Sequence, residues 1–194
     1  MYSALHTAYF YRGDIIPCVV EVEIKDGIGI HVVGLPDSTV KESLLRVCTA
    51  LQHFGFSIPG KKVVINIEPH GGSTQWAGCI RPRECFTGFD LAILFGILIA
   101  SEQIGKASAA GLDDCLFYGA LRLDGKITAP YTGITGNDAA SILAWQLRRS
   151  YNHFITYPVA TEGWIERTVT AEWGFDNIGD VLEYLIDQRI IKQD

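Results

Sequence analysis

The chain has 194 residues, of which 48% are hydrophobic and 20% are charged, enough for one domain with a sizeable core. Its formal charge of −6 argues against broad binding to the phosphate backbone of nucleic acids, which relies on clustered Lys and Arg. The longest apolar run, around 91–100, is shorter than the ~20 residues of a membrane-spanning helix, and residues 1–10 lack the pattern of a secretory signal. We therefore expect a cytoplasmic protein without membrane contact, with at most weak or indirect contact with nucleic acid.

The clearest local pattern lies between Val33 and Glu68, where the sequence predicts a strand, a helix, a loop and a second strand. Gly34 and Pro36 end the first strand, and Asp37 is placed to cap the helix. The apolar stripe of this helix consists of Val40, Leu44, Val47 and Leu51. Gly55 supplies the residue that ends the helix, and 62–68 alternates as a strand.

The rest of the chain predicts short strands alternating with helices, an α+β or α/β arrangement. Residues 89–101 are apolar on nearly every side and predict a central buried helix. Segments 116–120 and 122–128 predict a hairpin-like pair around Asp124-Gly125, which is a strong turn signal. Further helices are expected over 137–149, 161–171 and 177–188, and a strand over 154–158.

The five cysteines form no CxxC pair, which favours reduced thiols over a disulfide framework. His70, Cys79 and Cys85 share one loop, but structural zinc sites usually contain close ligand pairs. We therefore expect no metal site.

Three segments carry a family resemblance. They are GLPDSTVKES at 34–43, the Gly55-Phe56 pair with Pro59 after the predicted helix, and VVINIEP at 63–69. Together they resemble the magnesium-chelatase-like AAA+ proteins of the ComM/YifB type. The resemblance covers nearly the whole chain but only that family's N-terminal domain, so we expect one domain over 1–190 and no AAA+ ATPase domain. It implies the Lon protease-like fold, also described as ribosomal protein S5 domain 2-like, in which helices pack on a mixed sheet.

The resemblance also locates where a Lon-type peptidase keeps its catalytic pair, a serine nucleophile activated by a lysine. It places Gly88 at the nucleophile position and Thr135 near the lysine position, which implies a degenerate site with no catalytic residue. Asp90, in the first turn of the buried helix, is explained by the helix dipole. Thr87 is expected to cap that helix, and the alternative is that Thr87 acts as a displaced nucleophile.

No GxxxxGK[ST] segment occurs, so the chain is not expected to hydrolyse ATP by itself, and no cofactor is expected. The segment 70–87 is longer than the family pattern. It is interpreted either as a surface insertion, which is favoured, or as a partner-binding loop. The side chains that would bind the partner are Trp76, Arg81, Arg83 and Glu84.

The leading hypothesis is a catalytically inactive Lon-like domain that serves assembly or substrate engagement. Two alternatives stay open: a divergent Ser/Thr peptidase using Thr87, and a DNA-processing accessory module. The arginines considered for DNA contact are Arg81, Arg83, Arg148 and Arg149. The partners implied by the resemblance are an AAA+ ATPase, in the same or a separate chain, and further copies of this chain.

Overall fold

The computed structural model describes residues 1–11, 14–34, 38–69, 85–130, 150–158 and 174–192. Its main sheet contains seven strands in the order β10-β7-β1-β2-β4-β3, with β5 paired to β1 beside β7. The strands are β1 (Tyr2–Tyr11), β2 (Asp14–Lys25), β3 (Ile30–Val33), β4 (Lys62–Pro69), β5 (Cys85–Thr87), β7 (Cys115–Tyr118) and β10 (His153–Thr156). The pairs β1/β7, β7/β10 and β3/β4 are parallel and the others antiparallel, so the sheet is mixed.

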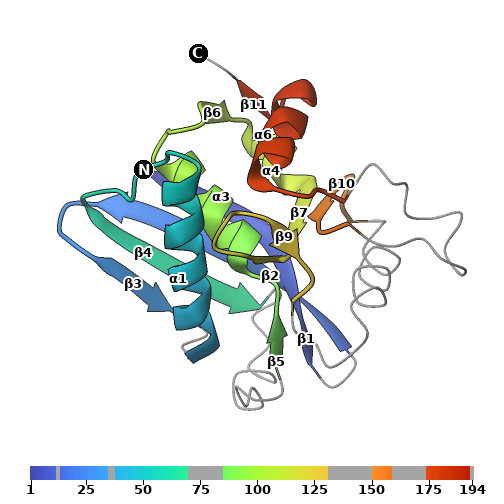
Figure 1. Cartoon of the computed structure of the whole chain (residues 1–194), viewed down its shortest axis with the longest axis horizontal. Helices are drawn as coiled ribbons and strands as arrows, with labels where there is room; N and C mark the ends of the chain where they lie inside the picture. Colours follow the sequence, from blue (N-terminus) through green and yellow to red (C-terminus); the bar gives the residue numbers. More distant parts are fainter. Residues whose placement is uncertain (12–13, 35–37, 70–84, 131–149, 159–173, 193–194) are drawn as a thin grey trace, which may run out of the picture.

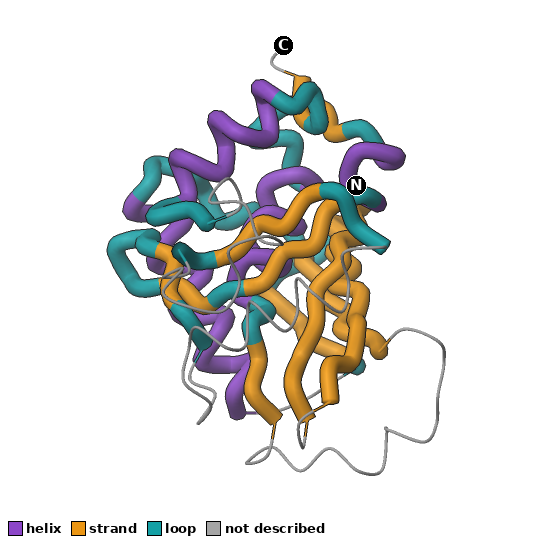
Figure 2. The backbone as a smooth tube through the Cα atoms, turned by 90° about the vertical axis from the view of Figure 1, so that its right-hand side faces the viewer, coloured by secondary structure: helices purple, strands orange, loops and turns teal. Residues whose placement is uncertain are grey.

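The two longest described helices cover one face of this sheet (Figures 1 and 2). The described helices are α1 (Ser38–His53), α3 (Asp90–Ala100), α4 (Ala109–Asp113) and α6 (Ile178–Asp187). Helix α3 packs on β1 and β2, and α1 lies beside it over the same face. Two small sheets complete the fold: β8 (Ala120–Leu121) with β9 (Ile127–Thr128), and β6 (Lys106–Ala107) with β11 (Ile191–Lys192). The α/β arrangement with helices on a mixed sheet is as predicted.

Helix α3 is the centre of the core, and every one of its residues is buried, as its all-round apolar sequence predicts. Gly96 lets the helix approach β2 closely, because a Cβ there would lie 2.7 Å from Cγ2 of Val22. The hydroxyl of Ser3 donates to the Gly96 carbonyl oxygen at 2.8 Å. The helix and the two long strands therefore form one packed unit.

The strand, helix and second strand predicted between Val33 and Glu68 are confirmed as β3, α1 and β4. Val40, Val47 and Leu51 of the α1 stripe are buried, whereas Leu44 is only half-buried. Gly55 follows the helix with φ +79, a left-handed conformation that favours glycine. Asp37, the predicted cap, lies outside the described residues.

Four described strands were missed by the sequence analysis: β1, β5, and the short strands β6 and β11. Residues 2–11 form the central strand β1, and residues 85–87, expected in a loop, form β5. The hairpin predicted around Asp124-Gly125 is confirmed, but it is formed by β8 and β9, whereas residues 115–118 form β7 of the main sheet. The last helix is confirmed as α6, with an Asn177/Asp180 capping box. The helices expected over 137–149 and 161–171 lie outside the described residues.

Polar side chains cover part of the sheet face opposite α1 and α3. Tyr2 donates from its hydroxyl to Glu21 at 2.6 Å, and the Asn66 amide donates to the same carboxylate at 2.8 Å. The Glu21 hydrogen bond raises the pKa of Tyr2 to about 12. In the part of the chain that the structure describes, no helix has both the length and the apolar character needed to cross a membrane.

Candidate functional site

The candidate site lies where β5 leads into α3. Thr87 is the last residue of β5 and pairs with Tyr9 of β1, and Gly88 then accepts a hydrogen bond from the Gly119 N–H at 3.0 Å. The N-cap position of α3 belongs to Phe89, which makes no side-chain cap bond. The prediction that Thr87 caps the helix is therefore wrong, because the strand continues through Thr87 and the helix starts only at Asp90.

Gly88, the position that the resemblance assigns to a nucleophile, has no space for a side chain. A Cβ at Gly88 would lie 2.5 and 2.6 Å from two ring carbons of Tyr118, and 3.1 Å from the Gly119 nitrogen. The Tyr118 side chain is itself fully buried, and the centroid of its ring lies 6.4 Å from the centroid of the Tyr157 ring. Since this ring lies in a packed interior, it cannot readily move aside. The position is closed by packing as well as lacking a reactive group.

Asp90 is fully buried, and its carboxylate is held by three donors. The Arg46 guanidinium from α1 donates from Nε at 2.6 Å and from Nη2 at 3.1 Å, and the Leu121 N–H from β8 donates at 2.9 Å. Arg46 Nη2 also donates to the hydroxyl of the buried Ser43 at 3.1 Å. The hydrogen bond to Asp90 raises the pKa of Arg46, which favours the charged guanidinium. This network joins α1, α3 and β8, so the Asp90 carboxylate has a structural role in holding these elements together.

Sequence analysis placed Asp90 but missed Arg46. The signal was the carboxylate itself: an aspartate inside an all-apolar helix is buried, and a buried charge is normally paired with an opposite charge. Arg46 lies 44 residues away in sequence, so only the packing of α1 on α3 identifies it as the partner.

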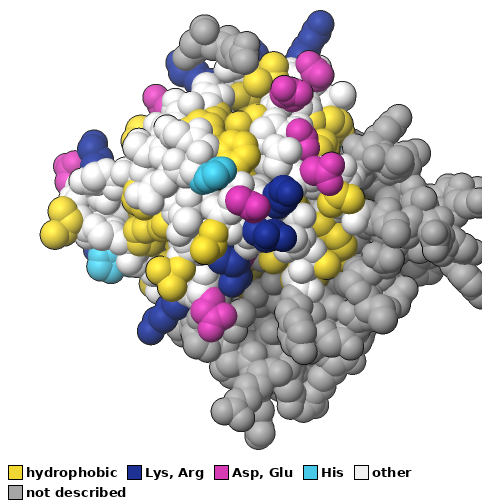
Figure 3. Space-filling model, viewed as in Figure 1, with side chains coloured by type: hydrophobic (Ala, Val, Ile, Leu, Met, Phe, Trp, Pro, Cys, Tyr) yellow, Lys and Arg dark blue, Asp and Glu magenta, His cyan; other side chains and the backbone are white. Residues whose placement is uncertain are grey.

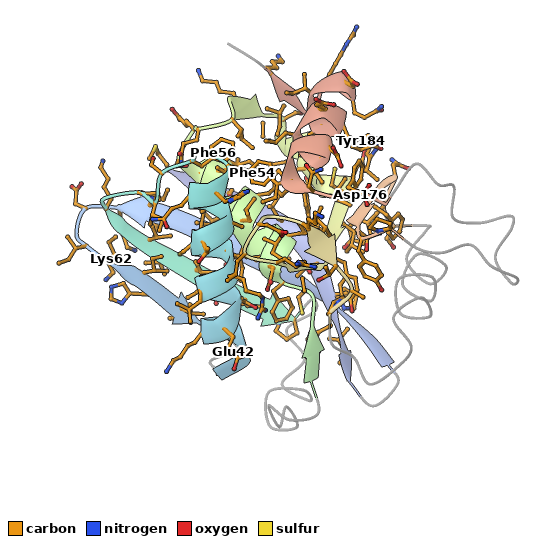
Figure 4. All side chains as sticks on the ribbon, in the orientation of Figure 1. Glu42, Phe54, Phe56, Lys62, Asp176 and Tyr184 are labelled. Carbon is orange, nitrogen blue, oxygen red and sulfur yellow. The ribbon has the colours of Figure 1, made fainter. Side chains whose placement is uncertain are left out.

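The β8–β9 hairpin, which supplies the Leu121 donor, is fixed from its other end. Gly125 at its turn packs against the ring of Phe54 and against Ile178 at the start of α6. Phe54 follows the end of α1 (Figure 4). The Ile127 N–H also donates to the Asp176 carbonyl oxygen at 2.9 Å. The hairpin is thus held between α1 and α6, and the donor to Asp90 is held with it.

A peptidase using Thr87 would need a base beside it, and neither Lys106 nor Lys126 is shown there. Lys106 lies on β6, at the opposite end of the molecule from β5 (Figure 1). Lys126 is exposed, donates its N–H to Asp124 at 3.1 Å, and bridges to Asn177. The side chain of Thr87 is outside what the structure describes.

Several predicted site residues lie outside the described ranges. These are Thr135, Trp76, Arg81, Arg83, Glu84, Arg148 and Arg149. Their predicted roles stay predictions. Among the described residues no group of three His, Cys, Asp or Glu side chains gathers closely enough to hold a metal ion.

Gly88→Ser is expected to lower the free energy of unfolding by about 1–3 kcal/mol, because the new side chain overpacks against Tyr118. Gly60→Ser is the matched control, since nothing lies within 4 Å of a Cβ at that exposed glycine. Tyr118→Leu in the same chain should reduce the added cost of Gly88→Ser in a double-mutant cycle. Chemical denaturation measures all four variants, and equal costs at the two glycines would contradict the closed position.

Comparison with known proteins identifies the family. The family model described as subunit ChlI of Mg-chelatase matches residues 20–137, from β2 past the β8–β9 hairpin. The chain belongs to this family. The matched segment contains Gly88, Asp90 and Thr135 of the candidate site.

Relatives of known name agree with this assignment. The chain is 36% identical over 126 residues to the uncharacterized protein YifB of Escherichia coli, covering 64% of this chain and 22% of that protein. It is 34% identical over 131 residues to the competence protein ComM of Haemophilus influenzae, covering 67% of this chain and 22% of that protein. The chain therefore spans about a fifth of the length of these relatives. The resemblance to ComM and YifB seen in the sequence is confirmed.

Proposed function

We propose that this chain is a catalytically inactive, Lon protease-like domain of a magnesium-chelatase-like AAA+ protein, serving assembly or substrate engagement. The observation that carries the proposal is the packing at Gly88, where the buried Tyr118 ring occupies the space that a nucleophilic side chain needs. A hydroxyl nucleophile must be able to reach both its base and the substrate carbonyl. A closed glycine provides neither a hydroxyl nor a route to one.

The Asp90 network supports the same conclusion. A catalytic acid or base has to exchange a proton with the substrate, so it needs access and a free lone pair or proton. Asp90 is fully buried and receives hydrogen bonds from Arg46 and Leu121. Its proposed role is to hold α1 and the β8–β9 hairpin against α3.

The proposed partner is an AAA+ ATPase, in the same or a separate chain, because the chain matches about a fifth of relatives that continue beyond it. We propose that the domain acts in the cytoplasm together with this partner. The similarity to a competence protein favours, as a second candidate, an accessory role in DNA processing. On the face shown in Figure 3, acidic and basic side chains of the described residues are interspersed, which supports weak or indirect contact with DNA at most.

Purified protein is expected to leave casein and unfolded substrates intact over long incubation, both before and after Thr87→Ala. Thr49→Ala is the matched control, because the Thr49 hydroxyl lies on the exposed side of α1 and bonds to the Leu45 carbonyl oxygen at 2.8 Å. Gel electrophoresis and mass spectrometry of the substrates measure the result. Cleavage that persists in Thr49→Ala but is lost in Thr87→Ala would establish the peptidase alternative.

A further inference from the structure

Strand β3 forms one edge of the main sheet. It pairs with β4 on one side, and no described strand pairs with it on the other (Figure 1). Exposed sheet edges are templates for pairing with another strand, and proteins usually protect them with charged side chains, Pro or a bulge. The four residues of β3, Ile-His-Val-Val, contain neither a charged residue nor Pro.

The ladder with β4 shows which backbone groups are open. The Val63 N–H donates to the Gly29 carbonyl oxygen at 2.9 Å, and Ile30 lies opposite Val63 in the parallel register. In a parallel ladder, alternate residues of a strand direct their backbone groups to the same neighbour. Gly29, His31 and Val33 therefore face β4, whereas the N–H and C=O groups of Ile30 and Val32 point away from the sheet.

We propose that two copies of this chain associate by antiparallel pairing of β3 with β3, about a two-fold axis that passes beside His31. In this register Ile30 of one copy lies opposite Val32 of the other, so both open residues of each strand form hydrogen-bonded pairs. Moving the axis to Ile30 or Val32 would instead place Ile28 or Gly34, outside β3, opposite a strand residue. Only the register centred on His31 satisfies all the open groups within β3.

The charge distribution favours a second copy as the occupant of this edge. Each chain carries a formal charge of −6, so two copies repel one another wherever acidic surfaces meet. The segment 27–34 contains no charged residue, so pairing here brings no like charges directly opposite each other. The exposed His31 side chain of each copy meets its equivalent on the sheet face away from α1, and the exposed Val33 meets Gly29.

The expected dimer is weak, because the strand is short and the contact small. It extends one mixed sheet across two molecules and leaves the surroundings of Gly88 and Asp90 unchanged. The inference goes beyond the proposed function and does not rest on it, since pairing at β3 and catalysis near Gly88 fail or succeed separately.

Sedimentation equilibrium of the full chain, from about 10 μM to about 1 mM, measures the association. We expect the average mass to rise from 21.4 kDa towards twice that value with concentration. His31→Glu and His31→Lys should each weaken the dimer about five-fold or more, because they place like charges directly opposite at the axis. Mixing the two variants should restore association, since Glu then faces Lys.

Val33→Glu and Val33→Lys are the matched controls. They change the net charge by the same amounts on the same exposed face, but each new charge lies opposite Gly29 and away from its equivalent. They should weaken the dimer less, and their mixture should gain little. A mass that stays at 21.4 kDa throughout, or equal effects at positions 31 and 33, would overturn the proposal.

Amide hydrogen exchange gives a readout that needs no variant. Protection of the Ile30 and Val32 amides should increase with protein concentration, whereas the His31 and Val33 amides, which face β4, should be protected at every concentration. Concentration-independent exchange at Ile30 and Val32 would also overturn the pairing.

Discussion

Arg46→Ala is expected to lower the free energy of unfolding by about 3–5 kcal/mol. The substitution leaves the fully buried Asp90 carboxylate without its opposite charge and, among the described residues, with the Leu121 N–H as its donor. An uncompensated buried charge is among the most destabilising changes a single substitution can make. Urea denaturation followed by circular dichroism measures the loss.

Arg122→Ala is the matched control for this experiment. Arg122 also faces a carboxylate, Asp124 at 3.7 Å, but 64% of its side chain is exposed. Exposed pairs contribute about 0–1 kcal/mol, so the control should change little. The double variant Arg46→Met with Asp90→Leu should recover part of the lost stability, because it removes both charges together. A cost below about 1 kcal/mol for Arg46→Ala would contradict the structural role of the pair.

Leu94→Ala is expected to lower the free energy of unfolding by about 2–5 kcal/mol, because Leu94 is fully buried in α3 and its truncation leaves a cavity. Leu45→Ala is the matched control, since Leu45 on α1 is 70% exposed and should change stability by no more than about 0.5 kcal/mol. Leu44→Ala, at a half-buried position, should fall between them. Denaturation curves with equal midpoints for Leu94→Ala and Leu45→Ala would contradict the position of α3 in the core.

The elements that the sequence predicts well are those with a strong local pattern. Helix α1 has an apolar stripe and a closing glycine, α3 is apolar all round, and α6 begins with a capping box. Each of these signals lies within the element that it specifies. They could therefore be interpreted without any knowledge of the packing.

The missed strands depend on contacts between distant segments. In β1 the positions facing away from α3 include Ala4 and Ala8, so polar and apolar residues do not alternate cleanly. Strand β5 has only three residues and exists because β1 supplies its partner. Local patterns cannot report pairing of this kind.

The candidate site likewise combines features that the sequence predicts with features that only the packing shows. Its position at Gly88 and Asp90 follows from the family resemblance, which comparison with known proteins confirms. The features that decide its chemistry, the Tyr118 ring against Gly88 and the Arg46 guanidinium on Asp90, are tertiary contacts. The equivalence of this position to a Lon-type active site stays a prediction.

The most direct test of the proposed function asks whether any hydroxyl in the chain is activated, and it requires no knowledge of a substrate. The full chain is incubated with a β-lactone probe, which acylates activated Ser and Thr nucleophiles, and its intact mass is measured. We predict that the mass stays unchanged and that Thr87→Ala behaves identically. A stoichiometric adduct that maps to Thr87 and is lost in Thr87→Ala would contradict the account of a domain without catalytic chemistry.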